Sequence, residues 1–188
     1  MNRFKRAALL TLLSREMRKR GSWCGETHLQ KAMFFLQELL CVEAGFVFIL
    51  YRHGPFSFDL RDELSSMQAD NLLELVIKAQ GYGPAFVPTP FSEEFLQRFP
   101  KTTARHLDRI EFLAEELRGK GVSDLERIST AFFIANREGI SDVEERAERL
   151  VELKPHISVP EAQWASKYVE SLIERSVPFV VQEEAEAS

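Results

Sequence analysis

The apolar positions in the first forty residues recur at helical spacing and predict two amphipathic helices. The first is predicted to begin after Asn2, a favourable N-cap residue, and to end near Arg20. Its apolar stripe consists of Leu9, Leu10, Leu13 and Met17. The second is predicted to begin at Thr27 as its N-cap, with a stripe of Leu29, Ala32, Met33, Leu36 and Leu40. Each helix therefore has one apolar face to bury.

A continuous apolar run at 46–51 interrupts the helical pattern. Its aromatic and β-branched residues follow a glycine and predict a strand that is buried on both faces. The Gly54-Pro55 pair then predicts a rigid turn, because a residue before proline favours extended backbone. Ser57 follows as the predicted N-cap of a short helix.

Two further segments predict a β-hairpin. Residues 71–79 and 85–90 are the expected strands, and 80–84 form the expected turn. The prolines in the second segment favour an edge strand. The resulting order of helices, strand, helix and hairpin resembles that of a winged-helix domain.

The rest of the chain has helical patterns only. Two Ser-Asp-x-Glu sequences have the form of capping boxes, and a proline near position 160 suits the first turn of a last helix. The predicted helix starts are Ser92, Thr102 or Thr103, the capping boxes at 123–126 and 141–144, and Pro160.

These elements predict a mostly helical α+β fold. An N-terminal half, residues 1–98, holds helices and a small antiparallel sheet with the Gly-Pro motif. A helical half, residues 99–180, packs on it in one compact unit, and an acidic tail at 181–188 is expected to be frayed. The only seam that the composition indicates is at 98–102.

Composition refines this picture without naming a function. The chain is 45% hydrophobic and 28% charged, which is ordinary for a globular protein. The longest apolar region, 32–50, contains Gln37, Glu38 and Glu43, so the sequence predicts no membrane span. Cys24 and Cys41 flank the second predicted helix, too far apart for a disulfide, and two free thiols are typical of the cytoplasm.

Catalytic and metal-binding signatures are weak. The nearest candidate for a nucleophile pair is His53 with Ser57, but a serine in this position is far more typical of a helix cap. Cys24 and His28 are four residues apart without a second pair that would complete a zinc site. We therefore expect a non-enzyme without metal or cofactor. A hydrolase that combines His53 with Asp59 and Glu63 is a remaining alternative.

The first helix is strongly basic and raises the alternative of a nucleic-acid-binding regulator. Residues 1–31 carry eight Lys and Arg against two acidic residues, although the net charge of the chain is −5. The helix in the recognition position, however, carries three acidic residues and one arginine, a poor match to DNA. The residues that would contact nucleic acid are Arg3, Lys5, Arg6, Arg15, Arg18, Lys19 and Arg20.

The segment 51–58, Tyr-Arg-His-Gly-Pro-Phe-Ser-Phe, is the strongest candidate for a contact site. A turn fixed by proline loses little entropy when it binds a partner, and Tyr and Arg are frequent anchors of protein interfaces. Together with the start of the second helix, it gives the predicted partner-binding set: Gln30, Lys31, Tyr51, Arg52, His53, Gly54, Pro55, Phe56 and Ser57.

The same residues carry a family resemblance. The segments 29–40 and 46–74, with "QK" at 30–31 and "YRHGPFS" at 51–57, resemble the YwgA-like family of small bacterial and archaeal proteins, as does "LKPHIS" at 153–158. The layout is distantly similar to the Panacea, or SocA-type, antitoxin domain. That similarity implies a helical module that neutralises toxins by binding them. The leading hypothesis is thus a non-enzymatic cytoplasmic protein-interaction module, antitoxin-like or part of a mobile-element or defence system.

Overall fold

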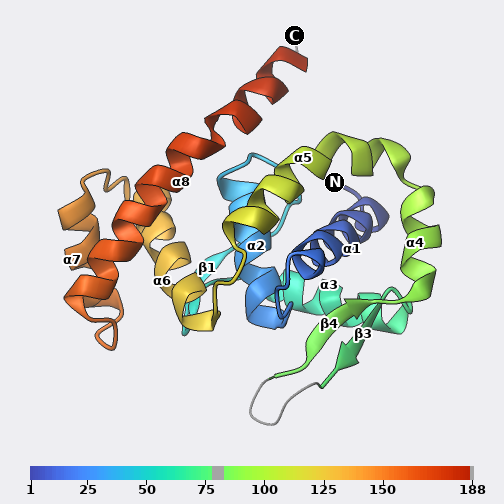
Figure 1. Cartoon of the computed structure of the whole chain (residues 1–188), viewed down its shortest axis with the longest axis horizontal. Coiled ribbons are helices and arrows are strands. Elements are labelled where there is room, and N and C mark those ends of the chain that lie inside the picture. The colour runs from blue at the N-terminus through green and yellow to red at the C-terminus, as the bar shows by residue number, and fades with distance from the viewer. Residues whose placement is uncertain (78–82, 187–188) are drawn as a thin grey trace.

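Two N-terminal helices lie at the centre of the structure, a computed structural model that describes residues 1–77 and 83–186, with side chains through residue 180 (Figure 1). Helix α1 spans Arg3–Lys19, and the side chain of Asn2 accepts a hydrogen bond from Lys5 N, which confirms the predicted cap. Helix α2 spans Glu26–Glu38. It begins earlier than predicted, because Gly25 is extended and bridges to Ala85, so that the helix starts directly after it.

Two short antiparallel hairpins replace the single strand and hairpin that the sequence predicts. β1 (Ile49–Tyr51) pairs with β2 (Gly54–Phe56), and β3 (Leu73–Val76) pairs with β4 (Ala85–Pro88). The prediction of a strand buried on both faces is wrong. A two-stranded hairpin covers the core with one face only, so alternate residues of the apolar run are exposed. Residues 78–82, which include the end of the predicted strand and most of the predicted turn, lie outside the described residues.

Helix α3 (Phe58–Ala69) follows the first hairpin. The Ser57 side chain accepts a hydrogen bond from Leu60 N, as predicted for an N-cap. The helix buries Leu60, Leu64 and Met67. The order of elements that resembles a winged helix is thus present, with an additional strand before α3.

The C-terminal half is helical, as predicted, but several helices begin elsewhere. The helices are α4 (Pro90–Gln97), α5 (Pro100–Glu116), α6 (Val122–Phe133), the π-helical turn η1 (Ile134–Glu138), α7 (Val143–Leu153) and α8 (Val159–Glu186). Prolines open α4 and α5, ahead of the predicted Ser92 and Thr102 or Thr103, because proline is favoured in the first turn. Gly121 caps α6 and Asp142 caps α7, so neither predicted serine is the cap. Helix α8 continues into the acidic tail and ends at Glu186.

One hydrophobic core joins the two predicted halves. It extends from Ala7 in α1 to Leu172 in α8. Helix α1 packs on α5, and α2 packs on α6, so the predicted seam at 98–102 is a bend between α4 and α5. These contacts give the mostly helical α+β fold expected from the sequence. In the part of the chain that the structure describes, no helix combines the length and apolarity needed to cross a bilayer.

Candidate functional site

The Gly-Pro motif forms the tip and inner strand of the first hairpin. Tyr51 pairs with Gly54 across the turn, and Leu50 pairs with Pro55. Arg52 and His53 occupy the two turn positions, and Gly54 follows with a φ of +85°. The strand residues pair one to one beside this two-residue turn, from Tyr51 with Gly54 to Ile49 with Phe56.

Gly54 is also a point of close approach to α6. A Cβ atom at this position would lie 3.0 Å from Ser129 Oγ, 3.0 Å from Thr130 Oγ1 and 3.4 Å from Glu126 O. The position therefore favours glycine for two independent reasons, the positive φ and the lack of space. The inner strand β2 can approach α6 only because residue 54 has no side chain.

Helix α2 holds the other end of the inner strand. The Gln30 side-chain amide donates to Ser57 O and accepts from Ser57 N, both at 2.9 Å. Lys31 Nζ donates to Pro55 O at 2.7 Å. Lys31 is only 1% exposed, and Gln30 and Ser57 are fully buried. The Gln-Lys pair therefore fixes the hairpin backbone from inside the molecule.

Glu126 of α6 is a buried carboxylate at which the hairpin tip meets the α7–α8 connection. His53 Nδ1 lies 3.3 Å from Oε2, and His156 Nε2 lies 3.2 Å from Oε1. Lys154 Nζ lies 4.0 Å from Oε1. Oε1 accepts no well-aligned hydrogen bond from the described residues. The Glu126 carboxylate thus lies beside the His53 ring of the hairpin turn and beside Lys154 and His156 of the α7–α8 connection.

Lys154 binds the turn directly. Its ammonium group donates to Tyr51 O and to Arg52 O, both at 2.6 Å. Burial lowers the pKa of Lys154, and the nearby Glu126 carboxylate opposes that effect. Two carbonyls of the turn therefore accept hydrogen bonds from one buried ammonium group.

Three short motifs that are far apart in the sequence meet at this hairpin. They are the Gln-Lys pair at 30–31, the turn at 51–57 and the Leu-Lys-Pro-His segment at 153–156. Sequence reasoning noted the last of these only as part of the family resemblance. It missed Glu126, Lys154 and His156 as site residues. The one available signal was the position of Lys154 and His156 on either side of Pro155.

The outer face of the hairpin is apolar and exposed. Val47, Ile49 and Tyr51 alternate along the chain and are 68%, 44% and 45% exposed, while Phe48 between them is buried. The Tyr51 ring contacts Phe56 and Phe58, with ring centroids 5.7 and 5.8 Å apart. We call Val47, Ile49, Tyr51 and Phe58 the apolar strip. Exposed large apolar side chains that lie together often mark a binding surface.

The backbone edge next to the apolar strip is open. Strand β2 lies against α2 and α6, and β1 is the outer strand of a two-stranded sheet. Because Pro55 has no N–H group, its partner Leu50 belongs to the pair that exchanges no hydrogen bonds. The N–H and C=O groups of Phe48 and Leu50 therefore point away from β2. No backbone group in residues 1–77 or 83–186 bonds to them.

The predicted partner-binding residues thus have two different placements. Tyr51, Arg52 and His53 are exposed and can reach a partner, and Phe56 is half-buried. Those that are buried and support the hairpin from within are Gln30, Lys31, Gly54, Pro55 and Ser57. The exposed apolar residues at 47 and 49 were missed, because the run at 46–51 was taken to be buried throughout.

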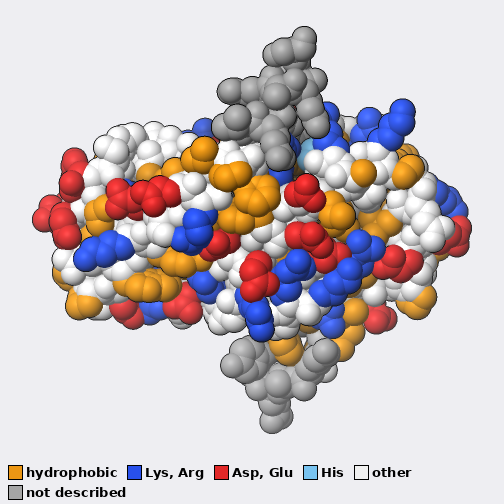
Figure 2. All heavy atoms as spheres, turned by 45° about the horizontal axis from the view of Figure 1, so that its top comes forward, with side chains coloured by type: hydrophobic (Ala, Val, Ile, Leu, Met, Phe, Trp, Pro, Cys, Tyr) orange, Lys and Arg blue, Asp and Glu red, His pale blue; other side chains and the backbone are white. Residues whose placement is uncertain are grey.

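The basic residues of α1 are mostly engaged in ion pairs within the molecule. Glu63 of α3 binds Arg3 and Arg6, and buried Glu16 binds three basic neighbours. On the face in Figure 2, Lys and Arg are interspersed with Asp and Glu and form no continuous basic field. The residues of the predicted nucleic-acid set that pair with an acid are Arg3, Arg6, Arg15, Lys19 and Arg20. Most of the charge of this helix is therefore neutralised.

The other candidate catalytic and metal-binding residues do not lie together in one site. Glu63 is paired with α1, and Asp59 is exposed, whereas the carboxylate at His53 is that of Glu126. Cys24 and Cys41 are free thiols, one buried and one exposed. Among the residues with described positions, no three His, Cys, Asp or Glu side chains are arranged to hold a metal ion.

Comparison with known proteins leaves the site to be interpreted from its geometry. The sequence matches no family model and no curated protein. The resemblance to the YwgA-like family and the Panacea domain therefore rests on the motif residues alone.

The burial of Lys31 predicts how the stability of the folded protein depends on pH. Burial, with a smaller contribution from Lys154, lowers the pKa of Lys31 from its ordinary value of 10.5 to about 8. Between these values the unfolded chain binds more protons than the folded chain, so Lys31 makes stability rise with pH. We expect wild type to gain up to about 3 kcal/mol relative to Lys31→Met between pH 8 and 10.5.

Urea unfolding of both proteins at several pH values measures this difference. Burial raises the pKa of Cys24 to about 11, so this thiol makes stability fall as the pH rises above 9. Its effect is common to both proteins and cancels. The exposed Lys167→Met variant is the control and should keep the pH dependence of wild type. A constant difference between wild type and Lys31→Met would contradict the buried charge.

Proposed function

We propose that the protein is a non-enzymatic protein-interaction module that binds an extended segment of a partner along β1. The partner segment adds a strand at the open edge, where its backbone bonds to Phe48 and Leu50. Its side chains alternate, and those that face the hairpin pack on the apolar strip. This mode of binding takes affinity from backbone hydrogen bonds and specificity from alternate side chains.

The observation that carries the proposal is an exposed apolar strip beside an open strand edge on an immobilised hairpin. An edge strand with apolar residues invites pairing with another chain unless it is covered or carries charges. Gln30, Lys31 and Lys154 fix the hairpin before any partner binds. A preformed edge lowers the entropic cost of association.

The motif resemblance suggests the kind of partner. In the Panacea domain, the similar layout belongs to a module that neutralises a toxin by binding it. We extend the proposal to an antitoxin-like role in the cytoplasm, within a mobile-element or defence system. The partner would then be a toxin or another defence component that contributes an extended apolar segment.

Ile49→Lys is expected to abolish partner binding without unfolding the protein. A lysine at this exposed edge position would place a charge against the apolar partner segment. The matched control is Val177→Lys, which alters a similarly exposed apolar residue on α8. Tagged wild type and both variants would be used to capture partners from nuclease-treated extract of the native host, with quantitative mass spectrometry.

The proposal is supported if wild type and Val177→Lys retain one protein in stoichiometric amount. Ile49→Lys should then capture about tenfold less of that protein, or still less, and a tenfold loss corresponds to about 1.4 kcal/mol of binding free energy. The complex must then form from the two purified proteins. Equal retention by Ile49→Lys and Val177→Lys would place the contact surface elsewhere. Material that disappears on nuclease treatment would instead support the nucleic-acid alternative.

A further inference from the structure

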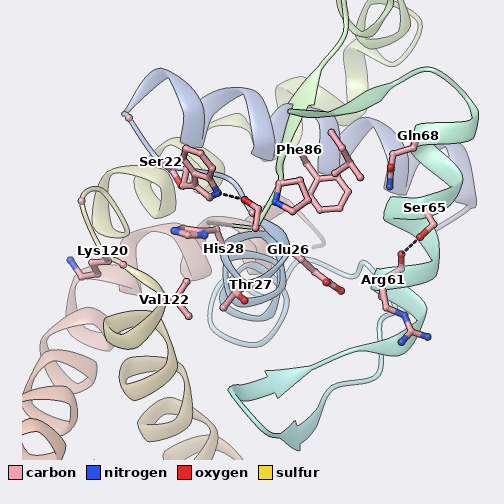
Figure 3. Close-up of a pocket in the computed structure, with 18 residues that line it drawn as sticks. Ser22, Glu26, Thr27, His28, Arg61, Ser65, Gln68, Phe86, Lys120 and Val122 are labelled. Carbon is pink, nitrogen blue, oxygen red and sulfur yellow. Dashed lines mark hydrogen bonds between the residues drawn. The ribbon is translucent and has the colours of Figure 1, made fainter. Parts of the chain in front are cut away.

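A cavity of about 700 Å³ lies on the molecule outside the hairpin site, and its volume is typical of sites for small molecules. It is partly open to solvent and is lined by the α1–α2 connection, the first turn of α2, the α5–α6 connection, one side of α3 and the start of β4 (Figure 3). Apolar side chains from several elements form part of its wall. They are Trp23, Leu75, Pro84, Phe86 and Val122.

Two helix N-termini meet in this cavity, and neither has a side-chain cap. Gly25 is the N-cap of α2 and Gly121 is the N-cap of α6, and no described side chain accepts a hydrogen bond from the first amides of either helix. Gly25 and Gly121 both line the cavity. Free N–H groups at a helix N-terminus, together with the helix dipole, favour an anion.

A buried histidine gives independent evidence for a ligand. His28 lines the cavity and is only 6% exposed, and neither of its ring nitrogens makes a hydrogen bond with any described residue. Nδ1 is sealed from solvent, so Nε2 is the nitrogen that a ligand in the cavity can reach. A buried polar atom without a partner is costly, and such atoms are uncommon in folded proteins. Burial lowers the pKa of His28 and so favours the neutral ring, which can donate a hydrogen bond to an anionic oxygen.

The side of the cavity opposite His28 carries the acidic side chain of Glu26. Neither oxygen of the Glu26 carboxylate accepts a hydrogen bond from the described residues. Oε1 is sealed from solvent, so Oε2 is the oxygen that a ligand can reach. In Figure 3, Glu26 extends from α2 toward the side formed by Ser65 and Gln68 of α3, whereas His28 extends the other way. The Glu26 side can therefore accept hydrogen bonds from amino or hydroxyl groups of a ligand.

We infer that this cavity binds a small organic anion of nucleotide size. Its phosphate or carboxylate group lies at the N-termini of α2 and α6 beside His28. Its flat body packs on Trp23 and Phe86, and its hydrogen-bond donors face Glu26. The site is separate from the hairpin, so it does not depend on the proposed protein-interaction function.

Binding of matched anionic and neutral probes to the full chain tests the inference by calorimetry. The phosphate pair is AMP and adenosine, and the carboxylate pair is indole-3-acetate and indole-3-acetamide. We expect the anion of at least one pair to bind with a dissociation constant below about 1 mM and about tenfold more tightly than its neutral partner. The pair that shows this preference identifies the anionic group.

Gly121→Asp is the decisive variant. A Cβ at Gly121 meets no atom within 4 Å, so the new carboxylate can cap α6 and occupy the anion position itself. Its thermal midpoint should equal or exceed that of wild type, while affinity for the preferred anion should fall about tenfold. Gly121→Ala, without charge or cap, should retain wild-type affinity.

His28→Leu provides a second variant that is not expected to impair folding, because the lost Nδ1 has no partner. It should weaken binding of the anion about fivefold and leave binding of the neutral analogue unchanged. The inference fails if neither anion binds, if each anion binds no better than its neutral partner, or if Gly121→Asp binds as well as Gly121→Ala.

Discussion

Gly54→Ala should destabilise the folded protein by about 3 kcal/mol, because the new methyl group meets two obstacles at once. The backbone at residue 54 has a φ of +85°, which costs an alanine about 1–2 kcal/mol. In addition, the Cβ would lie 3.0 Å from the hydroxyl oxygens of Ser129 and Thr130. The hairpin must then move away from α6, or both hydroxyls must rotate.

Gly45→Ala separates these two contributions. Gly45 has nearly the same φ, +82°, but a Cβ there meets no atom within 4 Å. Its replacement should cost only the conformational part, about 1–2 kcal/mol. Chemical unfolding of both variants measures the difference between them. Equal losses of stability would mean that the hairpin does not approach α6 as closely as the structure describes.

Lys154→Met should destabilise the protein by about 3 kcal/mol, comparable to Gly54→Ala. Methionine has similar length but cannot donate, so the carbonyls of Tyr51 and Arg52 lose the buried ammonium group. Glu126 also loses a nearby positive charge. Removal of one partner from a buried charged network is costly, because the other groups stay buried without compensation.

Lys167→Met is the matched control, because Lys167 is exposed and its loss should change stability by less than about 0.5 kcal/mol. The double variant Lys154→Met with Glu126→Gln adds a second test. Neutralising Glu126 removes the uncompensated carboxylate, so the double variant should lose less stability than the sum of the two single variants. Simple additivity, or a Lys154→Met protein as stable as Lys167→Met, would contradict the network.

The sequence predicted elements whose signals are local. The caps at Asn2 and Ser57 and the strand at Ala85–Pro88 were found because side-chain chemistry or proline alone determines them. The same rules failed at Ser123. There Gly121 becomes the cap, and no described side chain caps the first turn of α6, which lies at a cavity. A local capping signal was overridden where the fold leaves space for another group.

The support of the hairpin was only partly predictable. The pattern identified 30–31 and 51–57 as important but could not show that Gln30 and Lys31 point inward. Glu126 is 73 residues from His53, and Lys154 is 103 residues from Tyr51, so only the tertiary packing of α6 and α7 joins them. The apolar strip was hidden for a related reason. A strand buried on both faces and the exposed edge of a hairpin can have the same apolar run.

Hydrogen exchange of the protein alone and in its purified complex tests the proposed mode of binding most directly. We predict that the amides of Phe48 and Leu50, which have no backbone partner among the described residues, exchange rapidly in the free protein and become strongly protected in the complex. The amides of Ile49 and Tyr51, already directed toward β2, should change little. Unchanged exchange at Phe48 and Leu50, with protection confined to other segments, would contradict strand addition at this hairpin.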